Sequence, residues 1–127
     1  MSARILIVDD NSTNLKLAAD LLEVEGYAID RAVDAEQAQA LLEHTIPDLI
    51  LMDIALPGMD GLALTRMLKA DARLKHVPVV AMTAFAMSGD EREALDAGCD
   101  GYLTKPIDTR RFPQQVAAYL ERGRVRQ

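Results

Sequence analysis

The sequence has little of three things that would each assign a chain to a special class of protein. It has one cysteine, Cys99, so no disulfide can form within the chain, which is typical of a reducing compartment. It has no apolar run near the roughly 20 residues that span a bilayer, and its start lacks the apolar core of a secretory signal. It also has no excess of positive charge, because 14 basic residues against 20 acidic ones give a net charge of −6. A general nucleic-acid binder is therefore disfavoured, and a soluble cytoplasmic protein is expected.

The length and the composition favour one globular domain. The chain has 127 residues, half of them hydrophobic, which is enough for a single substantial core and unlike a disordered protein. It contains no repeat and no low-complexity linker. We expect one domain over residues 1–127, structured over about 3–121, with a basic, solvated tail at 122–127.

Short apolar runs alternate with amphipathic stretches along the chain. Ile5–Val8 contains no polar residue, which is typical of a strand buried on both faces, whereas Leu15 and Leu22 lie on one face of a helix expected from Ser12 to Glu25. Strands are predicted over residues 5–8, 27–32, 48–52, 77–82 and 101–103, each followed by a helix. Five such units predict the α/β class, a flavodoxin-like, doubly wound (βα)5 fold with a five-stranded parallel sheet.

Polar residues mark where two of the predicted helices begin. Asp34, with Gln37 three residues on, fits a capping box. Asp108 is a candidate cap for the last helix, but Pro113 then lies too deep for the first-turn position that proline prefers. The last helix therefore starts later than the residue after Asp108, or is distorted at Pro113.

The carboxyl ends of the predicted strands carry the polar side chains of interest, because ligands bind beyond these ends in an open parallel sheet. The first strand is followed by Asp9 and Asp10, the third by Asp53, the fourth by Thr83, and the fifth by Lys105 shortly afterwards. Each has an ordinary structural explanation alone, as a helix cap, a turn former or a surface lysine. All of these explanations together at four strand ends are improbable, so we expect a functional site at this edge.

Three carboxylates at one edge of a sheet repel one another unless a cation neutralises them. Mg²⁺ prefers oxygen ligands and is typically held by one or two carboxylates together with phosphate oxygens. A carboxylate is also a nucleophile toward phosphorus. The metal and Lys105 would then screen the charge of a transferring phosphoryl group, and Thr83 would donate a hydrogen bond to it.

Four motifs of the sequence resemble those of a known protein family. They are I-L-I-V-D-D-N, L-I-L-M-D-I-A-L-P-G-M-D-G, V-V-A-M-T-A and G-Y-L-T-K-P. In this order and spacing they resemble the receiver domains of two-component response regulators, and the match covers nearly the whole chain. The central motif most resembles that of stand-alone receivers of the DivK type.

The resemblance implies roles for the residues at the strand ends. Asp53 matches the phosphoacceptor, and Lys105 matches the phosphate-binding lysine. Asp10 and Asp53 match direct Mg²⁺ ligands, while Asp9 matches an acid that acts mostly through water. Ala55 matches the position whose backbone carbonyl binds the metal.

The resemblance also implies a switch. Thr83 and Tyr102 match the pair whose hydroxyl turns toward the phosphate and whose ring moves inward after phosphorylation. The Lys105–Pro106 peptide bond would be cis, as only an X–Pro bond allows cheaply. The implied phosphodonor is a sensor histidine kinase or a histidine phosphotransfer protein. Phosphorylation would then change the face formed by the fourth helix, the fifth strand and the fifth helix.

Because the sequence ends with its fifth helix, an output domain is not expected. The protein would therefore bind a downstream protein target, or relay the phosphoryl group, and would not act as an enzyme, on nucleic acid or at a membrane.

Two other functions fit the sequence less well. A phosphohydrolase with an aspartyl nucleophile and Mg²⁺ usually needs a second carboxylate two residues after the nucleophile, and that position is Ala55. It also usually carries a cap insertion, for which this chain has no room. A flavin carrier needs a phosphate-cradling loop rich in Ser, Thr and Gly after the first strand, where this chain has D-D-N-S-T-N.

Three further expectations concern single residues. His44 and His76 lie away from the strand ends and are expected at the surface, not as phosphodonors. Cys99 is expected to be a small core residue. Ala55 and Phe85 offer no group that orients a water for hydrolysis, so the phosphoryl group is expected to be long-lived.

Overall fold

The computed structural model describes residues 3–54, 61–83, 88–105 and 107–126. The expectations placed on Ala55, Phe85 and the Lys105–Pro106 bond lie outside these residues. The strands are β1 (Arg4–Val8), β2 (Ala28–Ala32), β3 (Leu49–Asp53), β4 (Val79–Thr83) and β5 (Gly101–Thr104). The helices are α1 (Ser12–Val24), α2 (Ala35–His44), α3 (Gly61–Ala70), α4 (Ser88–Asp96) and α5 (Phe112–Arg126).

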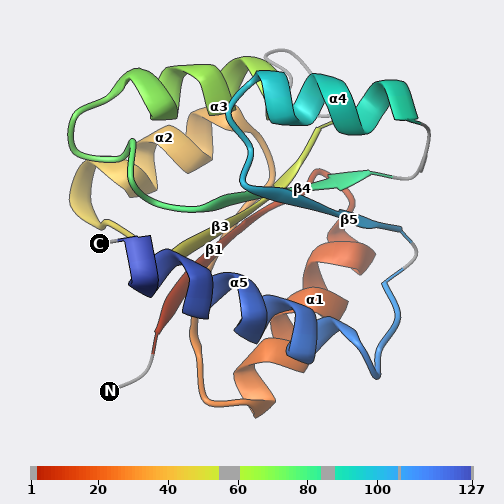
Figure 1. Ribbon diagram of the computed structural model, residues 1–127. Helices are drawn as coiled ribbons and strands as arrows, with labels where there is room; N and C mark the ends of the chain where they lie inside the picture. Colours follow the sequence, from red (N-terminus) through yellow and green to blue (C-terminus); the bar gives the residue numbers. More distant parts are fainter. Residues whose placement is uncertain (1–2, 55–60, 84–87, 106, 127) are drawn as a thin grey trace.

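The strands form one parallel sheet in the order β2-β1-β3-β4-β5, which confirms the predicted doubly wound fold. Helices α1 and α5 cover one face of the sheet, and α2, α3 and α4 cover the other (Figure 1). Among the described residues no helix is both long and apolar enough to cross a bilayer.

Alternate side chains of each strand enter two separate cores. In β1, Leu6 and Val8 pack with α2 and α3, while Ile5 and Ile7 pack with α1 and α5. Every residue of β3 and β4 is buried. Because both faces are covered, these strands need apolar residues at every position, and polar side chains are confined to the strand ends.

The observed caps explain where the first two helices begin. The side chain of Asn11 accepts a hydrogen bond from the Asn14 N–H and caps α1, so neither Asp9 nor Asp10 is the cap of this helix. Asp34 caps α2 as predicted, by accepting from the N–H of Gln37. The side-chain oxygen of Gln37 accepts a hydrogen bond from the Val33 N–H. In a standard capping box it would accept from the N–H of the cap residue itself, Asp34.

The last helix starts late, which is one of the two alternatives expected from Pro113, and it extends further at its carboxyl end than expected. It begins at Phe112, later than Asp108, whose carboxylate instead accepts from the N–H groups of Arg110 and Arg111. Pro113 is thereby the second helical residue, where its missing N–H costs nothing. The segment 122–127 was expected to be a tail, but α5 continues through it to Arg126. Arg122, Arg124 and Arg126 are good helix formers and favour this extension, whereas Gly123 within it does not. The outer limits of the domain stay a prediction.

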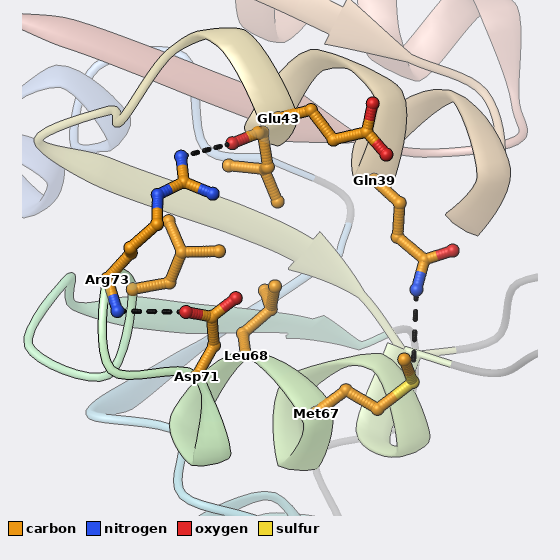
Figure 2. Close-up of a pocket in the computed structure, with 8 residues that line it drawn as sticks. Gln39, Glu43, Met67, Leu68, Asp71 and Arg73 are labelled. Carbon is orange, nitrogen blue, oxygen red and sulfur yellow. Dashed lines mark hydrogen bonds between the residues drawn. The ribbon is translucent and has the colours of Figure 1, made fainter.

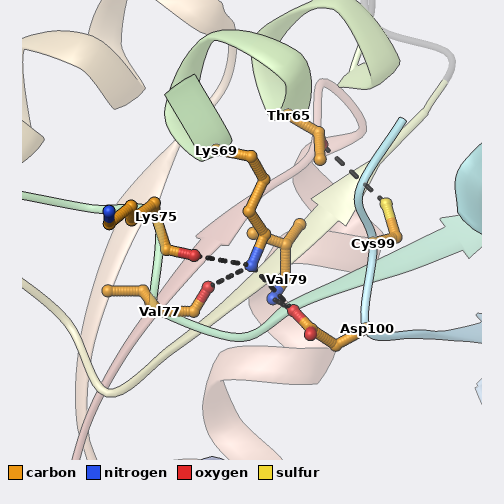
Figure 3. A network of polar contacts seen from close by, with 7 residues as sticks. All are labelled: Thr65, Lys69, Lys75, Val77, Val79, Cys99 and Asp100. Atoms are coloured by element: carbon orange, nitrogen blue, oxygen red, sulfur yellow. Dashed lines mark hydrogen bonds and ion pairs between the residues drawn. The ribbon is translucent and has the colours of Figure 1, made fainter. Parts of the chain in front are cut away.

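A polar network joins α3 to the beginnings of β4 and β5 (Figure 3). The Nζ of Lys69 lies 2.9 Å from Oδ2 of Asp100 and donates to the carbonyl oxygens of Val77, at 2.8 Å, and Lys75, at 3.3 Å. The same Asp100 oxygen accepts from the N–H of Val79 at 2.9 Å. The network therefore ties the end of α3 to two neighbouring strands.

We expect Asp100→Ala to lower the free energy of unfolding by about 2 kcal/mol, because it leaves a largely buried ammonium and one backbone N–H without this acceptor. The matched control is Asp20→Ala, which removes a carboxylate from an exposed pair with Lys16 and should change stability much less. Urea unfolding of both variants measures the difference. Equal losses in the two variants would contradict the role given to the network.

Candidate functional site

Four of the predicted site residues meet at the carboxyl edge of the sheet. Asp9 directly follows β1, Asp53 ends β3, Thr83 ends β4, and Lys105 directly follows β5. Asp9, Asp53 and Thr83 are buried, with 1%, 4% and 4% of their surface exposed, whereas Asp10 beside them is exposed. The Lys105 N–H donates to the Thr83 carbonyl at 2.7 Å, which holds the end of β5 against β4.

The carboxylates form one acidic cluster, defined here as Asp9, Asp10 and Asp53. One oxygen from each lies within 4.8 Å of the others, as the ligands of a single cation would. The Nζ of Lys105 lies 2.9 Å from Oδ2 of Asp9 and 3.2 Å from Oδ2 of Asp53. One ammonium faces three carboxylates, so negative charge remains in excess. Carboxylate oxygens are the donors that a hard divalent cation such as Mg²⁺ prefers, and the cluster therefore fits such an ion.

The burial of the cluster changes its acid–base properties. Burial raises the pKa of Asp9 above its usual value, and this effect outweighs the hydrogen bond and charge of Lys105, which act in the opposite direction. For Lys105, burial alone would lower the pKa, but its contacts with Asp9 and Asp53 outweigh burial and raise it. Lys105 is therefore a fixed positive charge at neutral pH.

Asp9 also organises the backbone at this edge. Its Oδ1 accepts from the N–H of Asn11 at 2.9 Å, while its Oδ2 faces Lys105. The interpretation of the two neighbouring acids as simple helix caps is thus wrong, because Asn11 caps α1. Sequence reasoning overlooked Asn11, although a side chain of this type just before a helical stretch is a recognised signal.

Thr83 and Tyr102 share one face of the sheet. Tyr102 pairs in register with Ala81, two residues before Thr83, and side chains two residues apart on a strand point the same way. Tyr102 is half-buried and packs against the core beneath α2, α3 and α4. The sheet therefore places a buried hydroxyl and a partly buried aromatic ring on the same side of adjacent strands.

The expected burial of Cys99 and the expected exposure of the two histidines are confirmed, whereas the lifetime expected from Ala55 and Phe85 stays a prediction. His44 and His76 are exposed. Cys99 is buried, and burial raises the pKa of its thiol, so it is a neutral core residue at physiological pH. Sequence reasoning overlooked Gly61, which begins α3 directly against the backbone of Asp53.

A hollow among the described residues lies away from the acidic cluster (Figure 2). It has a volume of about 320 Å³ and lies between the C-terminal halves of α2 and α3. Polar contacts cross it: Gln39 Nε2 lies 3.8 Å from Met67 Sδ, and Arg73 donates to the Leu42 carbonyl at 2.9 Å. It lies toward the amino edge of the sheet and is separate from the site.

Comparisons with known proteins agree with this geometry. Residues 5–117 match the family model described as the response regulator receiver domain. The chain belongs to the response-regulator receiver family. It is a module of two-component signalling, as the resemblance predicted.

Individual relatives agree with the family assignment. The polar-differentiation response regulator DivK of Brucella ovis is 46% identical over 120 residues, which cover 94% of this chain and 98% of that protein. A CheY-like receiver domain protein of Methanospirillum hungatei superposes with a TM-score of 0.91 at 29% identity and covers 100% of both chains. The chemotaxis response regulator CheY4 of Vibrio cholerae, at 23% identity, shares the fold with a TM-score of 0.89 over 94% of this chain and 99% of that one.

We expect Asp10→Asn to raise the free energy of unfolding of this receiver by about 1 kcal/mol in metal-free buffer, because it removes one of three mutually repelling charges. The matched control is Glu25→Gln, which removes an exposed charge at the end of α1 and should change stability much less. Chemical denaturation with a chelator present measures both. Destabilisation by Asp10→Asn would mean that the three carboxylates do not repel one another significantly.

Proposed function

We propose that this receiver is a phosphorylation-dependent switch that accepts a phosphoryl group on Asp53. The observation that carries the proposal is the contact between the buried Asp53 carboxylate and the Lys105 ammonium, 3.2 Å apart, at the edge where two further acids lie. A buried carboxylate at the end of a strand, with a cation fixed beside it, is placed to attack phosphorus and to keep the charge of the product screened.

The reaction is the transfer of a phosphoryl group from a phosphohistidine of a sensor kinase or a phosphotransfer protein. An oxygen of the Asp53 carboxylate forms a bond to phosphorus, and the bond between phosphorus and the histidine nitrogen breaks. The leaving imidazole takes up a proton, and Asp53 becomes an acyl phosphate. Lys105 contacts the Asp53 carboxylate before transfer and would screen the phosphoryl oxygens afterwards.

Asp10 and Asp53 are the proposed direct ligands of Mg²⁺. Asp9 is proposed to act through water, since its two oxygens already contact the Asn11 N–H and Lys105. The backbone carbonyl of Ala55 is the proposed fourth contributor and lies outside the described residues. Bound Mg²⁺ would supply neutralisation of the charge on the phosphoryl oxygens.

The proposed output is a change in the face built from α4, β5 and α5, through Thr83 and Tyr102. Thr83 would donate its hydroxyl to the phosphoryl group, and the ring of Tyr102 would move into the space released on the same side of the sheet. The partner is then a downstream protein, or a second phosphotransfer protein in a relay. We further propose that the protein acts in the cytoplasm, is not an enzyme, and binds neither nucleic acid nor membrane.

Asp53→Asn should abolish phosphorylation by acetyl phosphate in millimolar Mg²⁺, because an amide is a poor nucleophile toward phosphorus. Intact-protein mass spectrometry measures the added phosphoryl mass. Asp20→Asn, which changes an exposed acid on α1, is the control and should react at the wild-type rate. Uptake by Asp53→Asn at the wild-type rate would show that another residue is the acceptor.

Beryllofluoride, a phosphoryl mimic, should slow or speed hydrogen exchange in α4, β5 and α5 as well as at the strand ends. The reason is a two-state coupling, in which one arrangement of Thr83 and Tyr102 binds the phosphoryl group better and is therefore favoured. Peptide-resolved exchange with and without the mimic measures this effect. A response confined to the strand ends would contradict the proposed output face.

A further inference from the structure

The first turn of α3 lies unusually close to the strand end that carries Asp53. A Cβ atom at position 61 would overlap the carbonyl oxygen of Asp53 and would lie 2.8 Å from Cα of Ile54 and 2.9 Å from the carbonyl carbon of Asp53. All three neighbours are backbone atoms, which cannot move aside as the end of a flexible side chain can. Only glycine at position 61 therefore allows α3 and β3 to approach this closely.

Ile54, the residue after Asp53, is held through its backbone from two sides. On one side, the N–H of Ile54 donates to the Met82 carbonyl of β4 at 3.3 Å. On the other side, the carbonyl of Ile54 accepts from the N–H of Gly61 at 3.3 Å. The backbone next to Asp53 is thus fixed between the neighbouring strand and the first residue of α3.

Thr65, one turn further along α3, holds Gly61 in place. It is completely buried, and its hydroxyl donates to the Gly61 carbonyl at 2.8 Å. The hydroxyl oxygen of Thr65 also lies 3.9 Å from Sγ of Cys99, a weak donor on the segment before β5 (Figure 3). Serine at position 65 would keep this hydroxyl. Valine would keep the shape of the threonine side chain but lose the hydrogen bond to the Gly61 carbonyl.

We propose that Gly61 and Thr65 are positioning residues for the reaction of Asp53, an inference that rests on the function proposed above. Gly61 sets how far α3 lies from the Asp53–Ile54 peptide, and Thr65 fixes the first turn of α3 through the Gly61 carbonyl. Together they hold the Asp53 carboxylate at its distance from Lys105 and from the other acids of the cluster. Misplacement of a reacting group by about 1 Å can slow a reaction about a hundredfold, so these contacts should be visible in the rate.

The first test compares Gly61→Ala with Gly26→Ala. Gly26 has a φ of +94°, and a Cβ atom there would meet nothing within 4 Å, so alanine strains the backbone at the far end of α1 without touching the site. At saturating acetyl phosphate and Mg²⁺, Gly61→Ala should be phosphorylated at least about tenfold more slowly than wild type, whereas Gly26→Ala should stay within about twofold. Urea unfolding of both variants shows whether each is folded under the assay conditions.

The second test uses Thr65 and does not depend on whether Gly61→Ala folds. Thr65→Val should slow phosphorylation several-fold, and Thr65→Ser should restore most of the wild-type rate, because it restores the donor to the Gly61 carbonyl. A role in packing alone predicts the reverse order, since serine loses a buried methyl group and valine does not.

A readout independent of reactivity separates this inference from the proposed function. The ¹³C shift of the Asp53 carboxylate, measured by NMR without any phosphodonor, should change in Gly61→Ala and Thr65→Val but not in Gly26→Ala. If wild type shows no phosphorylation while these shifts behave as expected, the proposed function is wrong, and Gly61 and Thr65 position the Asp53 carboxylate without serving that reaction. If the shifts in Gly61→Ala match those in Gly26→Ala, or if Thr65→Ser is slowed as much as Thr65→Val, the positioning inference is overturned.

Discussion

The ammonium of Lys105 lies within 3.2 Å of two buried carboxylates that belong to different strands, Asp9 after β1 and Asp53 at the end of β3. Each of these charges would be costly to bury alone, so their mutual contact is what allows the edge of the sheet to be both charged and largely closed to water. The pairing is incomplete, because Asp10 adds a third carboxylate to the same cluster. Under the proposed function, this excess of negative charge is what would attract a further cation to the edge.

The covered sheet explains why this charge lies where it does. Strands β3 and β4 are buried along their full length, so a polar side chain within them would meet an apolar helix on either face. Asp53 and Thr83 are the last residues of their strands, where the covering layers end and neighbouring strand ends come together. The parallel direction of the strands brings their carboxyl ends to one edge, and with them residues that are far apart in sequence.

Because buried parallel strands carry polar residues only at their ends, much of the fold and of the site at the carboxyl edge of the sheet was predictable from the sequence. The apolar run Ile5–Val8 and the cap at Asp34 depend on local patterns, and both are found as expected. Contacts between distant segments were not predictable in the same way. The pair of Lys69 and Asp100 joins residues 31 positions apart, and neither residue has a local pattern that names its partner. The close approach of Gly61 to Asp53 depends on the separation of α3 from β3, which no periodicity encodes.

Helix α3 connects the two sides of the site. Its first residue, Gly61, lies against the backbone of Asp53, and near its end Lys69 pairs with Asp100, directly before β5. Strand β5 then leads to Lys105, whose ammonium returns to the Asp53 carboxylate. The contacts therefore form a closed path on which Asp53 and Lys105 are joined both directly and through α3. Under the proposed function, a change of charge at Asp53 would act on both ends of this path, and Tyr102 lies within it, on β5. Contact alone does not make such a path a switch, because a switch also needs an element with two discrete arrangements. Under the proposed function, that element is the ring of Tyr102 beside Thr83.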